Sequence, residues 1–248
     1  MGFSLSNCKT GFLNHCSRLV RGALPQCCLL CGVGSPSALL CAACEAALPR
    51  LPRTRCGTCA LPVTGAAVCG ACLNRPPRFD RVSAVFAYRF PLDALVQGLK
   101  YGGNLAVAGV LGETLARAIA SERVDLIVPM PLSVQRLRER GFNQAHEIAR
   151  SVARATGIPV AAEASRRVID TAAQAKLPWK ERARNVRGAF VCDADLSGRS
   201  VAVVDDVMTT GATLDELAKS LKRAGAAEVR GWVVARALKH DQAFRTML

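Results

Sequence analysis

The amino-acid sequence predicts an α/β fold in which a mostly parallel sheet, flanked by helices, follows a small cysteine-rich domain. Three observations support this prediction. Strand-like apolar runs alternate with helix-like runs over most of the chain, which is typical of parallel sheets covered on both faces. Cysteines gather in the first third of the sequence. Between these regions, residues 74–78 contain two prolines, which discourage helix and indicate a linker.

These observations divide the 248 residues into three parts. Residues 1–24 show no clear pattern and are expected to form an N-terminal extension. Residues 25–75 are rich in Cys, Pro and Gly and are expected to form the cysteine-rich domain. Residues 76–248 are expected to form the α/β domain, a size at which a chain can bury a core of its own.

The composition indicates a soluble protein with a basic surface. Half of the residues are hydrophobic, and the net charge is +14. This charge suits polyanionic partners such as nucleic acid or phosphorylated substrates, although a solvated basic surface would give the same value. No uncharged apolar run reaches the ~18 residues of a membrane span, and the N-terminus lacks the apolar stretch of a signal peptide. We therefore expect a cytoplasmic location without membrane insertion.

Eight cysteines form four Cys-x-x-Cys pairs. Nine residues separate the first pair from the second, and nine separate the third from the fourth. The four pairs are Cys28/Cys31, Cys41/Cys44, Cys56/Cys59 and Cys69/Cys72. Two residues between cysteines let one tight turn direct both sulfurs at one ion, and four thiolates complete a tetrahedral shell. We expect two structural zinc ions, because a segment this short needs metal to supply folding energy.

Other interpretations of the cysteines stay open at this point. A single occupied site, a redox dithiol set or an iron–sulfur cluster would use the same residue type. Sequential use of the four pairs is the simplest arrangement, but a nested one is an alternative, and Cys27 is an alternative to Cys28. Cys8, Cys16 and Cys192 have no evident partner and are expected to be ordinary thiols.

Each element of the α/β domain follows from its apolar spacing and its punctuation by Gly and Pro. The expected strands are 82–90, 124–128, 200–204 and 229–235, and the expected helices are 92–100, 105–120, 143–156 and 213–224. For Asn143, capping of the following helix is the stronger interpretation, and contact with a ligand is the alternative. The same two interpretations apply to Gln144.

The segment from Val201 to Thr213 carries the chemistry. An apolar strand ends in two acids, Asp205 and Asp206, and a loop of small residues then opens a helix. Backbone N–H groups of such a loop can surround a phosphate, and the helix N-terminus adds positive potential. The two carboxylates can accept hydrogen bonds from vicinal ribose hydroxyls. The segment therefore suits a ribose 5-phosphate group at the carboxyl end of a strand, where open α/β sheets bind ligands.

This segment resembles the phosphoribosyl pyrophosphate (PRPP) motif of type I phosphoribosyltransferases, and the chain as a whole resembles the ComF family of competence-associated proteins. The resemblance spans roughly residues 25–237. Beside the four cysteine pairs it rests on Leu99-Lys100-Tyr101, Val128-Pro129-Met130-Pro131-Leu132, Arg136, Arg140-Gly141-Phe142-Asn143-Gln144-Ala145, Gln174-Ala175-Lys176-Leu177, Arg182, Asn185, Val186, Gly188, Ala189 and Phe190.

The resemblance implies a type I phosphoribosyltransferase-like sheet preceded by a double zinc ribbon, and it implies roles for particular residues. Asp205 and Asp206 would contact the ribose of PRPP. The loop after Val128 would lie near the pyrophosphate, and Mg²⁺ would bind mainly to PRPP oxygens. The 5′-phosphate would be held by Thr209, Thr210, Gly211, Ala212 and Thr213, and the pyrophosphate would be neutralised by Arg136 or Arg140.

Two functions follow from the resemblance. The first is a competence-associated role in DNA uptake and natural transformation, in which the protein handles single-stranded DNA with the competence machinery and the pocket binds PRPP. The alternative is an active phosphoribosyltransferase that transfers a ribose 5-phosphate group to an unidentified acceptor. The basic stretch 165–187 is either a hood over the pocket or a solvated loop. The same cradle serves binding and turnover, so the motif does not decide between the two functions.

Overall fold

The computed structural model describes residues 27–35, 38–169 and 186–238. The chain forms two compact units, residues 1–48 and 49–248. The first unit contains the helix α2 (Ala42–Ala46) and a pairing of Cys27 with Gly34. The predicted extension and most of the basic stretch lie outside the described residues, and so do Cys8, Cys16, Lys180, Arg182 and Arg184.

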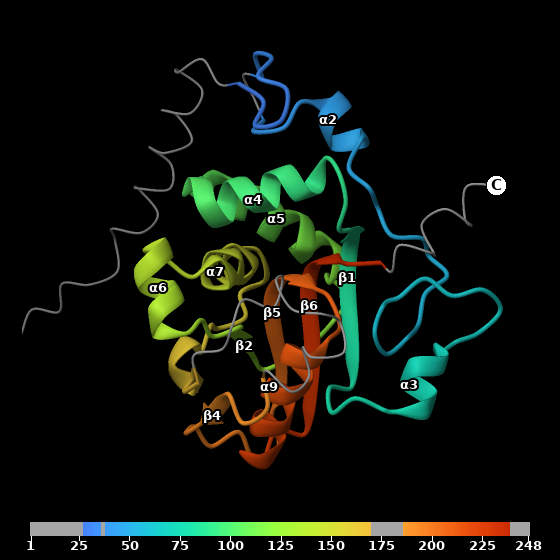
Figure 1. Ribbon diagram of the computed structural model, residues 1–248, viewed down its shortest axis with the longest axis vertical. Coiled ribbons are helices and arrows are strands. Elements are labelled where there is room, and N and C mark those ends of the chain that lie inside the picture. Colours follow the sequence, from blue (N-terminus) through green and yellow to red (C-terminus); the bar gives the residue numbers. More distant parts are fainter. Residues whose placement is uncertain (1–26, 36–37, 170–185, 239–248) are drawn as a thin grey trace, which may run out of the picture. The chain divides into compact units, whose positions relative to one another are not determined.

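The second unit is built on a four-stranded parallel sheet in the order β1-β6-β5-β2 (Figure 1). The strands are β1 (Arg81–Ala87), β2 (Leu126–Pro129), β5 (Ser200–Met208) and β6 (Glu228–Arg236). All four residues of β2 are buried, as is expected of a strand covered on both faces. The predicted α/β class with a parallel, helix-flanked sheet is confirmed.

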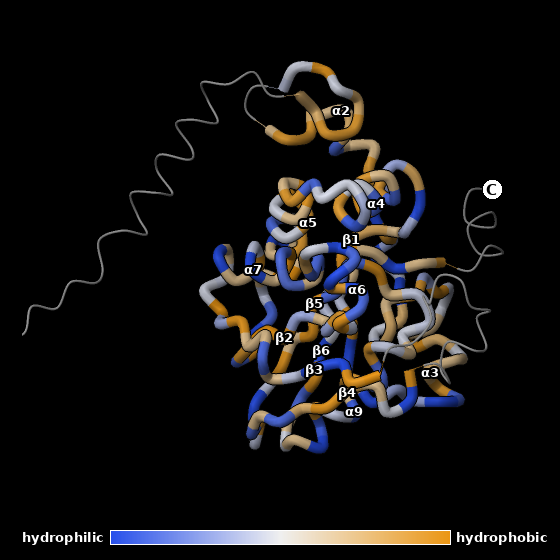
Figure 2. The backbone as a smooth tube through the Cα atoms, turned by 60° about the vertical axis from the view of Figure 1, so that its left-hand side comes forward, coloured by the Kyte–Doolittle hydropathy of each residue, from blue (hydrophilic) through white to orange (hydrophobic). Residues whose placement is uncertain are grey.

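Helices cover both faces of this sheet. On one face, α9 (Ala212–Arg223) packs Leu214, Leu217 and Leu221 into a core that includes Val201 and Val203 of β5. On the other face, α7 (Gln144–Thr156) contacts β2 and β5, and α5 (Leu105–Ala118) contacts β1 and β6. The further helices are α3 (Gly70–Asn74), α4 (Leu92–Gly102) and α6 (Val134–Arg140). Figure 2 shows hydrophilic and hydrophobic positions alternating along several of these elements.

Several boundaries differ from the sequence-based expectation. Strand β5 does not end before Asp205 but continues to Met208, because residues 205–208 still pair with residues 233–236 of β6. Conversely, β1 ends at Ala87, three residues before the expected end at Phe90. The short helix α6 was not expected, and neither was the two-stranded antiparallel sheet of β3 (Ser165–Arg167) and β4 (Phe190–Cys192). None of the described helices has the length and apolar character needed to cross a lipid bilayer.

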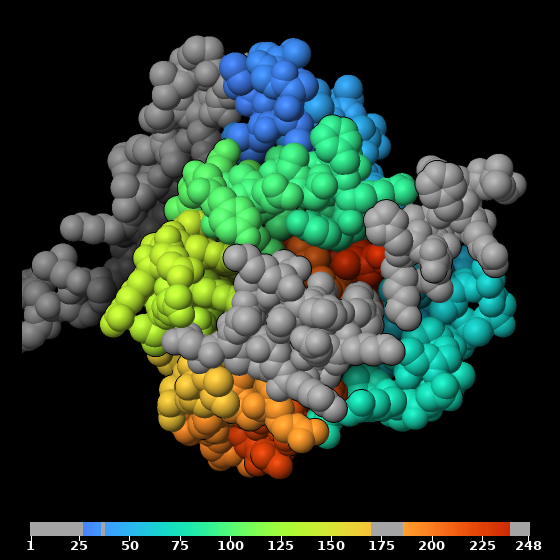
Figure 3. Space-filling model, in the orientation of Figure 1, coloured from blue at the N-terminus to red at the C-terminus, as the bar shows by residue number. Residues whose placement is uncertain are grey.

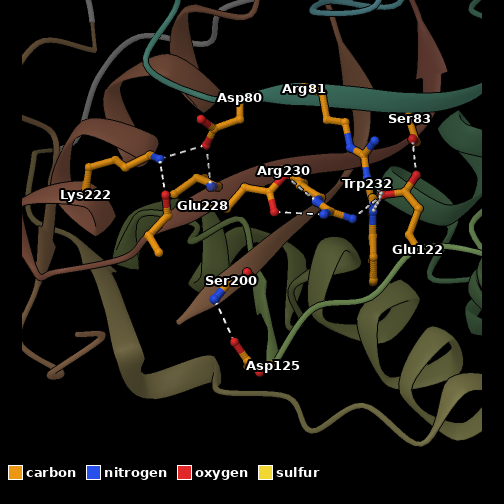
Figure 4. Close-up of polar contacts among 12 residues, drawn as sticks. Asp80, Arg81, Ser83, Glu122, Asp125, Ser200, Lys222, Glu228, Arg230 and Trp232 are labelled. Carbon is orange, nitrogen blue, oxygen red and sulfur yellow. Dashed lines mark hydrogen bonds and ion pairs between the residues drawn. The ribbon is translucent and has the colours of Figure 1, made fainter. Parts of the chain in front are cut away.

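A polar network closes the sheet at the amino ends of its strands (Figure 4). Glu122 accepts hydrogen bonds from Trp232 Nε1 at 2.9 Å and from Arg230 Nη1 at 3.4 Å. Asp125 Oδ2 accepts from the backbone N–H of Ser200 at 2.7 Å. These contacts lie at the amino ends of the strands. The loops at the opposite, carboxyl ends take no part in them and are therefore available to form a binding site.

Helices α5 and α7 approach each other closely at Gly112. A Cβ atom at this position would lie 2.4 Å from Ser151 Cβ and 2.9 Å from the carbonyl oxygen of Ile148. We expect Gly112→Ala to lower the free energy of unfolding by roughly 1–3 kcal/mol, because one of the helices must shift to admit the methyl group. The measurement is urea denaturation followed by circular dichroism.

Gly109→Ala on the same helix is the matched control. A Cβ atom there meets nothing within 4 Å, and alanine is favoured over glycine in helices by ~1 kcal/mol. We therefore expect this substitution to raise stability or leave it unchanged. Equal effects of the two substitutions would contradict the described packing of α5 against α7.

Candidate functional site

The eight paired cysteines form two four-sulfur clusters, which the sequential arrangement predicts and the nested one does not. One cluster contains Cys28, Cys31, Cys41 and Cys44, and the other contains Cys56, Cys59, Cys69 and Cys72. Within each cluster the four sulfur atoms lie within 4.8 Å of one another. Cys27 is exposed and outside both clusters, so it does not replace Cys28. The spare thiol Cys192 also lies outside both clusters.

The geometry of both clusters fits a tetrahedral zinc ion. Zn–S bonds of about 2.3 Å place neighbouring sulfurs about 3.8 Å apart, and the Cys31–Cys41 and Cys59–Cys69 sulfurs are 3.8 Å and 3.6 Å apart. The donor set of four thiolates and no open position is that of a structural site. The four cysteine sulfurs of each cluster are therefore already arranged as the ligands of a tetrahedral zinc ion would be.

Backbone N–H groups stabilise one thiolate at the same position of each cluster. Cys41 N–H donates to Cys28 Sγ at 3.4 Å, and Cys69 N–H donates to Cys56 Sγ at 3.2 Å. Burial raises the pKa of Cys28, but N–H donors from residues that include Cys31 and Cys41 outweigh it and hold the pKa at about 6. The same balance holds the pKa of Cys56 at about 6. Both thiols are thus set up as thiolates, the form that binds metal.

The second cluster belongs to the core of the sheet-containing unit. Cys56 and Cys59 are buried in the same hydrophobic cluster as Phe79 and Met208. Arg236, at the end of β6, donates from Nε to the carbonyl oxygen of Cys59 at 2.9 Å. The first cluster lies in the other compact unit. The two zinc shells therefore have the same local geometry and different surroundings.

The two predicted acids lie near the carboxyl end of β5. Asp206 is 3% exposed, and its Oδ2 forms an ion pair of 2.6 Å with Nζ of Lys100, near the end of α4. The other carboxylate oxygen, Oδ1, accepts a hydrogen bond from the backbone N–H of Val207 at 2.7 Å, so Lys100 and the strand backbone together hold the carboxyl group in place. Figure 3 shows atoms of the orange and red β5–β6 region reaching the surface below the green α4.

Lys100 is the charged residue that the sequence analysis did not assign to the site. It contributed only to the family resemblance, and its separation from Asp206 in sequence gave no reason to pair them. Burial alone would lower the pKa of Lys100, but the Asp206 carboxylate outweighs burial and raises it. Lys100 is thus held as a cation beside the acid pair.

Asp205 behaves differently from its neighbour. Burial raises the pKa of its carboxyl group, the Asp206 charge adds to this effect, and Lys100 opposes it, with the result that the pKa is about 8. The carboxyl oxygen of Asp205 accepts a hydrogen bond from the backbone N–H of Asp206 at 2.9 Å. Burial and the neighbouring acid thus favour the protonated form of Asp205.

The loop from Thr209 to Gly211 connects the acids to α9. Gly211 has φ of +83°, which a side chain would strain, and a Cβ there would lie 2.5 Å from Met208 Cε. The Thr210 hydroxyl accepts from the N–H of Ala212 at 3.1 Å. Thr213 stands in the first turn of α9, where N–H groups lack partners within the helix. The predicted order of acids, loop and helix is present, while the roles of these residues towards PRPP stay predictions.

The two predicted arginines lie on α6, which follows the loop after β2. The Arg140 guanidinium lies over the ring of Tyr101, with 5.4 Å between its Cζ atom and the ring centroid. Tyr101 is the residue that follows Lys100 in sequence. Arg136 lies one helical turn earlier, and its backbone N–H donates to the capping Ser133 side chain at 3.4 Å. The structure thus brings Arg140 beside the α4 end that carries Lys100, and the contact of either arginine with a pyrophosphate stays a prediction.

Asn143 caps α7, as the stronger interpretation of the sequence held. Its Oδ1 accepts from the N–H of Ala145 at 3.0 Å, and its Nδ2 donates to the carbonyl of Met130 at 3.0 Å. Gln144 is 5% exposed, and its Oε1 has no hydrogen-bond partner among the described residues. Asn143 therefore ties α7 to the loop after β2, and the amide oxygen of Gln144 has capacity to accept a further bond.

A cavity of about 1150 Å³ lies between the second cysteine cluster and the loop before α9. Cys59 and Cys72 line one side, and the segment 210–212 lines the other. The charged residues of its lining are Arg75, Arg78, Arg187, Asp215, Glu216, Lys219 and Arg236. Arg78 is engaged with Asp215 at 2.9 Å, so part of this charge is internally paired.

Two family models match the chain over these regions. A double zinc ribbon domain matches residues 19–73, and a phosphoribosyl transferase domain matches residues 138–244. The chain is 35% identical over 227 residues to the DNA utilization protein YhgH of Escherichia coli, with 87% of this chain and 99% of that protein covered. This chain belongs to the ComF family. Competence protein F of Haemophilus influenzae is 32% identical over 209 residues, with 80% of this chain and 90% of that protein covered.

The ComF chain thus joins a double zinc ribbon to a phosphoribosyltransferase domain, as the resemblance implied. Among solved structures, it is similar to the glutamine PRPP amidotransferase from B. subtilis, with 23% identity and a TM-score of 0.37. That match covers 51% of this chain and 25% of the other, and the fold rests instead on the strand order and family models above. The predicted boundary between residues 75 and 76 stays a prediction.

The raised pKa of Asp205 gives a pH-dependent prediction. The folded protein holds a proton on Asp205 up to a pH of about 8, whereas the unfolded chain releases it near the ordinary value of 3.8. Stability from this group therefore falls as pH rises from about 4 to 8. Asp205→Asn removes this loss. We therefore expect the Tm of the variant, measured relative to that of wild type, to be at least about 2 °C higher at pH 9 than at pH 5.

The control for this prediction is Asp193→Asn. Asp193 has a side chain that is 63% exposed and pairs only with a similarly exposed Arg166 among the described residues. Its Tm should run parallel to that of wild type across the same pH range. Parallel curves for Asp205→Asn as well would show that the Asp205 carboxyl ionises normally.

Proposed function

We propose that this ComF protein acts in the uptake or use of DNA and that its pocket binds PRPP or a related ribose 5-phosphate compound. The names of its relatives from E. coli and H. influenzae support the DNA role. One observation carries the ligand. A pair of adjacent acids near the end of β5, one half-buried and one buried, leads directly into a glycine loop at the start of α9.

The chemistry of the site fits this ligand class. A ribose hydroxyl would donate to the Asp206 carboxyl group beside its ion pair with Lys100. The segment 209–213 offers backbone N–H groups and hydroxyls at a helix N-terminus, which suits a 5′-phosphate. Arg136 and Arg140 would serve the pyrophosphate. Mg²⁺, when bound with PRPP, would supply charge neutralisation on the phosphate oxygens.

Phosphoribosyl transfer is the second candidate for the pocket itself. Such a reaction depends mainly on positioning and on neutralising the departing pyrophosphate, and Lys100 with Arg140 gives the site fixed positive charge on that side of α4. Release of pyrophosphate from PRPP in the presence of nucleobases or single-stranded DNA distinguishes turnover from binding. The acceptor would be identified by the compound that stimulates this release.

The PRPP proposal predicts the effect of removing the acid pair. Asp205→Asn combined with Asp206→Asn should weaken PRPP binding at least tenfold, because the ribose hydroxyls lose their carboxyl acceptors and Lys100 loses its ion-pair partner. Isothermal titration calorimetry with PRPP and Mg²⁺ is the measurement. Asp193→Asn with Asp195→Asn is the matched control, since it removes two acids from the loop after β4 and should leave affinity unchanged. Equal affinity of the acid-pair variant and wild type would show that the pocket is misassigned.

The charge and composition of the chain support the DNA role independently of the pocket. The net charge of +14 suits a polyanion, and phosphate contacts release counterions, so binding should fall steeply as salt rises. Aromatic residues make up only 5% of the chain, so base stacking should contribute little and sequence preference should be weak. Single-stranded DNA is therefore the expected partner, bound mainly through its backbone.

We expect fluorescence anisotropy to show binding of a labelled single-stranded oligonucleotide that weakens with added salt. Substituting Lys180, Arg182 and Arg184 by alanine, which removes three charges outside the described residues, should flatten the salt slope by roughly one unit per lost contact. Arg150, Arg154 and Arg223 substituted by alanine remove the same charge from α7 and α9 and form the control. Absence of binding at low salt would show that this chain alone does not hold DNA.

A further inference from the structure

Arg236 is a buried cation that donates hydrogen bonds to several backbone carbonyl groups and also interacts with the thiol of Cys59. It is the last residue of β6 and is 2% exposed. Nε donates to the carbonyl of Cys59 at 2.9 Å, and Nη1 donates to the carbonyls of Met208 and Ala237 at 3.0 Å each. Nη1 also donates to the carbonyl of Thr209. No ion pair with a carboxylate is recorded for Arg236 within the described ranges.

These acceptors come from two segments with different roles. Cys59 belongs to the second four-cysteine cluster, and Met208 with Thr209 forms the junction of β5 and the loop that leads to α9. These two segments meet at the guanidinium of Arg236, although Cys59 and Arg236 are 177 residues apart in sequence. A single side chain therefore joins the metal-binding turn to the proposed phosphate loop.

Packing reinforces this connection. Cys56, Cys59, Phe79 and Met208 share one hydrophobic cluster. Met208 and Phe79 also lie against Gly211, where a Cβ atom would be 2.5 Å from Met208 Cε and 3.7 Å from the Phe79 ring. The side of the loop that faces away from the acid pair is thus formed by residues that the second cluster holds in place.

The positive charge of Arg236 has its negative counterpart in the second cluster only while that cluster is ordered. Four thiolates on one Zn²⁺ leave a formal charge of −2, and the guanidinium lies beside that shell through its bond to Cys59. If the metal leaves, the turn loses the ion that folds it. Arg236 then loses an acceptor in a buried place, which costs more for a charged group than for a neutral one.

We propose that the metal at the second cluster sets the position of the loop 209–211 through Arg236, which is a positioning residue for the ligand pocket. The first cluster does not position this loop through Arg236, because the described acceptors of Arg236 all lie in the unit of residues 49–248. The link between metal and loop stands on these contacts alone. Its consequence for PRPP rests on the proposed function.

The two clusters provide matched variants. Cys44 and Cys72 occupy the same last position of their clusters. Cys44→Ser and Cys72→Ser should each lower the zinc content from about two ions to about one, as measured by elemental analysis. Hydrogen exchange of peptides covering residues 205–213, without ligand, should then accelerate at least tenfold in Cys72→Ser and stay unchanged in Cys44→Ser. Peptides covering α7 should stay protected in both variants, which shows that the fold is retained.

Arg236→Met tests the link itself. The variant should keep both zinc ions and still show fast exchange at residues 205–213, and Arg236→Lys should restore part of the protection because it keeps a buried donor. These two variants keep the proposal testable if Cys72→Ser does not fold. Unchanged exchange at residues 205–213 in Arg236→Met, or equal acceleration in the two cysteine variants, would overturn the proposal.

PRPP titration of the same proteins separates this proposal from the proposed function. Wild type and Cys44→Ser should bind PRPP alike, and Cys72→Ser and Arg236→Met should bind at least tenfold more weakly. If wild type binds no PRPP, the proposed ligand is wrong, and the exchange experiment still decides whether metal and loop are coupled. If all four proteins bind PRPP equally, the loop does not depend on the second cluster.

Discussion

The pairing of β5 with β6 beyond the apolar core is the constraint on which the rest of the site depends. Residues 205–208 remain hydrogen-bonded to residues 233–236, so two acids that would otherwise lie in a flexible turn are held in extended backbone. The same pairing places Met208 opposite Arg236. One strand extension therefore fixes the acid pair on one side and the arginine that contacts the second cysteine cluster on the other.

The electrostatics of the pocket follow from that rigid placement. Burial and the adjacent Asp206 raise the pKa of Asp205 by more than Lys100 lowers it, although Lys100 forms its ion pair with Asp206. The site thus combines an acceptor at Asp206 with a neutral acid at Asp205 without any ligand present. A ligand that carries hydroxyl donors and a phosphate would meet acceptors for the hydroxyls at the acids and N–H donors for the phosphate at the start of α9. The loop 209–211 separates these two groups.

Local features of the site were predictable from the sequence, and long-range ones were not. The Cys-x-x-Cys turns and the Asp205–Thr213 segment are encoded within a few residues, so spacing alone revealed them. The extension of β5 was missed because aspartates normally mark a strand end, and only the partner strand reverses that preference. Lys100 and Arg236 were missed because Asp206, the partner of Lys100, and Cys59, one partner of Arg236, are each more than 100 residues away in sequence. Helix α6 was missed because it has only seven residues, of which Val134 and Leu137 are apolar, too few to give a helical pattern.

The network around Glu122 has a consequence for how this protein can diverge. Glu122 connects β1 and β6, and the nearby Asp125 holds the start of β5, while the ligand loops emerge from the carboxyl ends. Substitutions that alter ligand preference therefore fall on segments that this network does not include. Such an arrangement lets lineages exchange loop residues with little loss of fold stability, so the scaffold and the specificity of the pocket can evolve at separate rates.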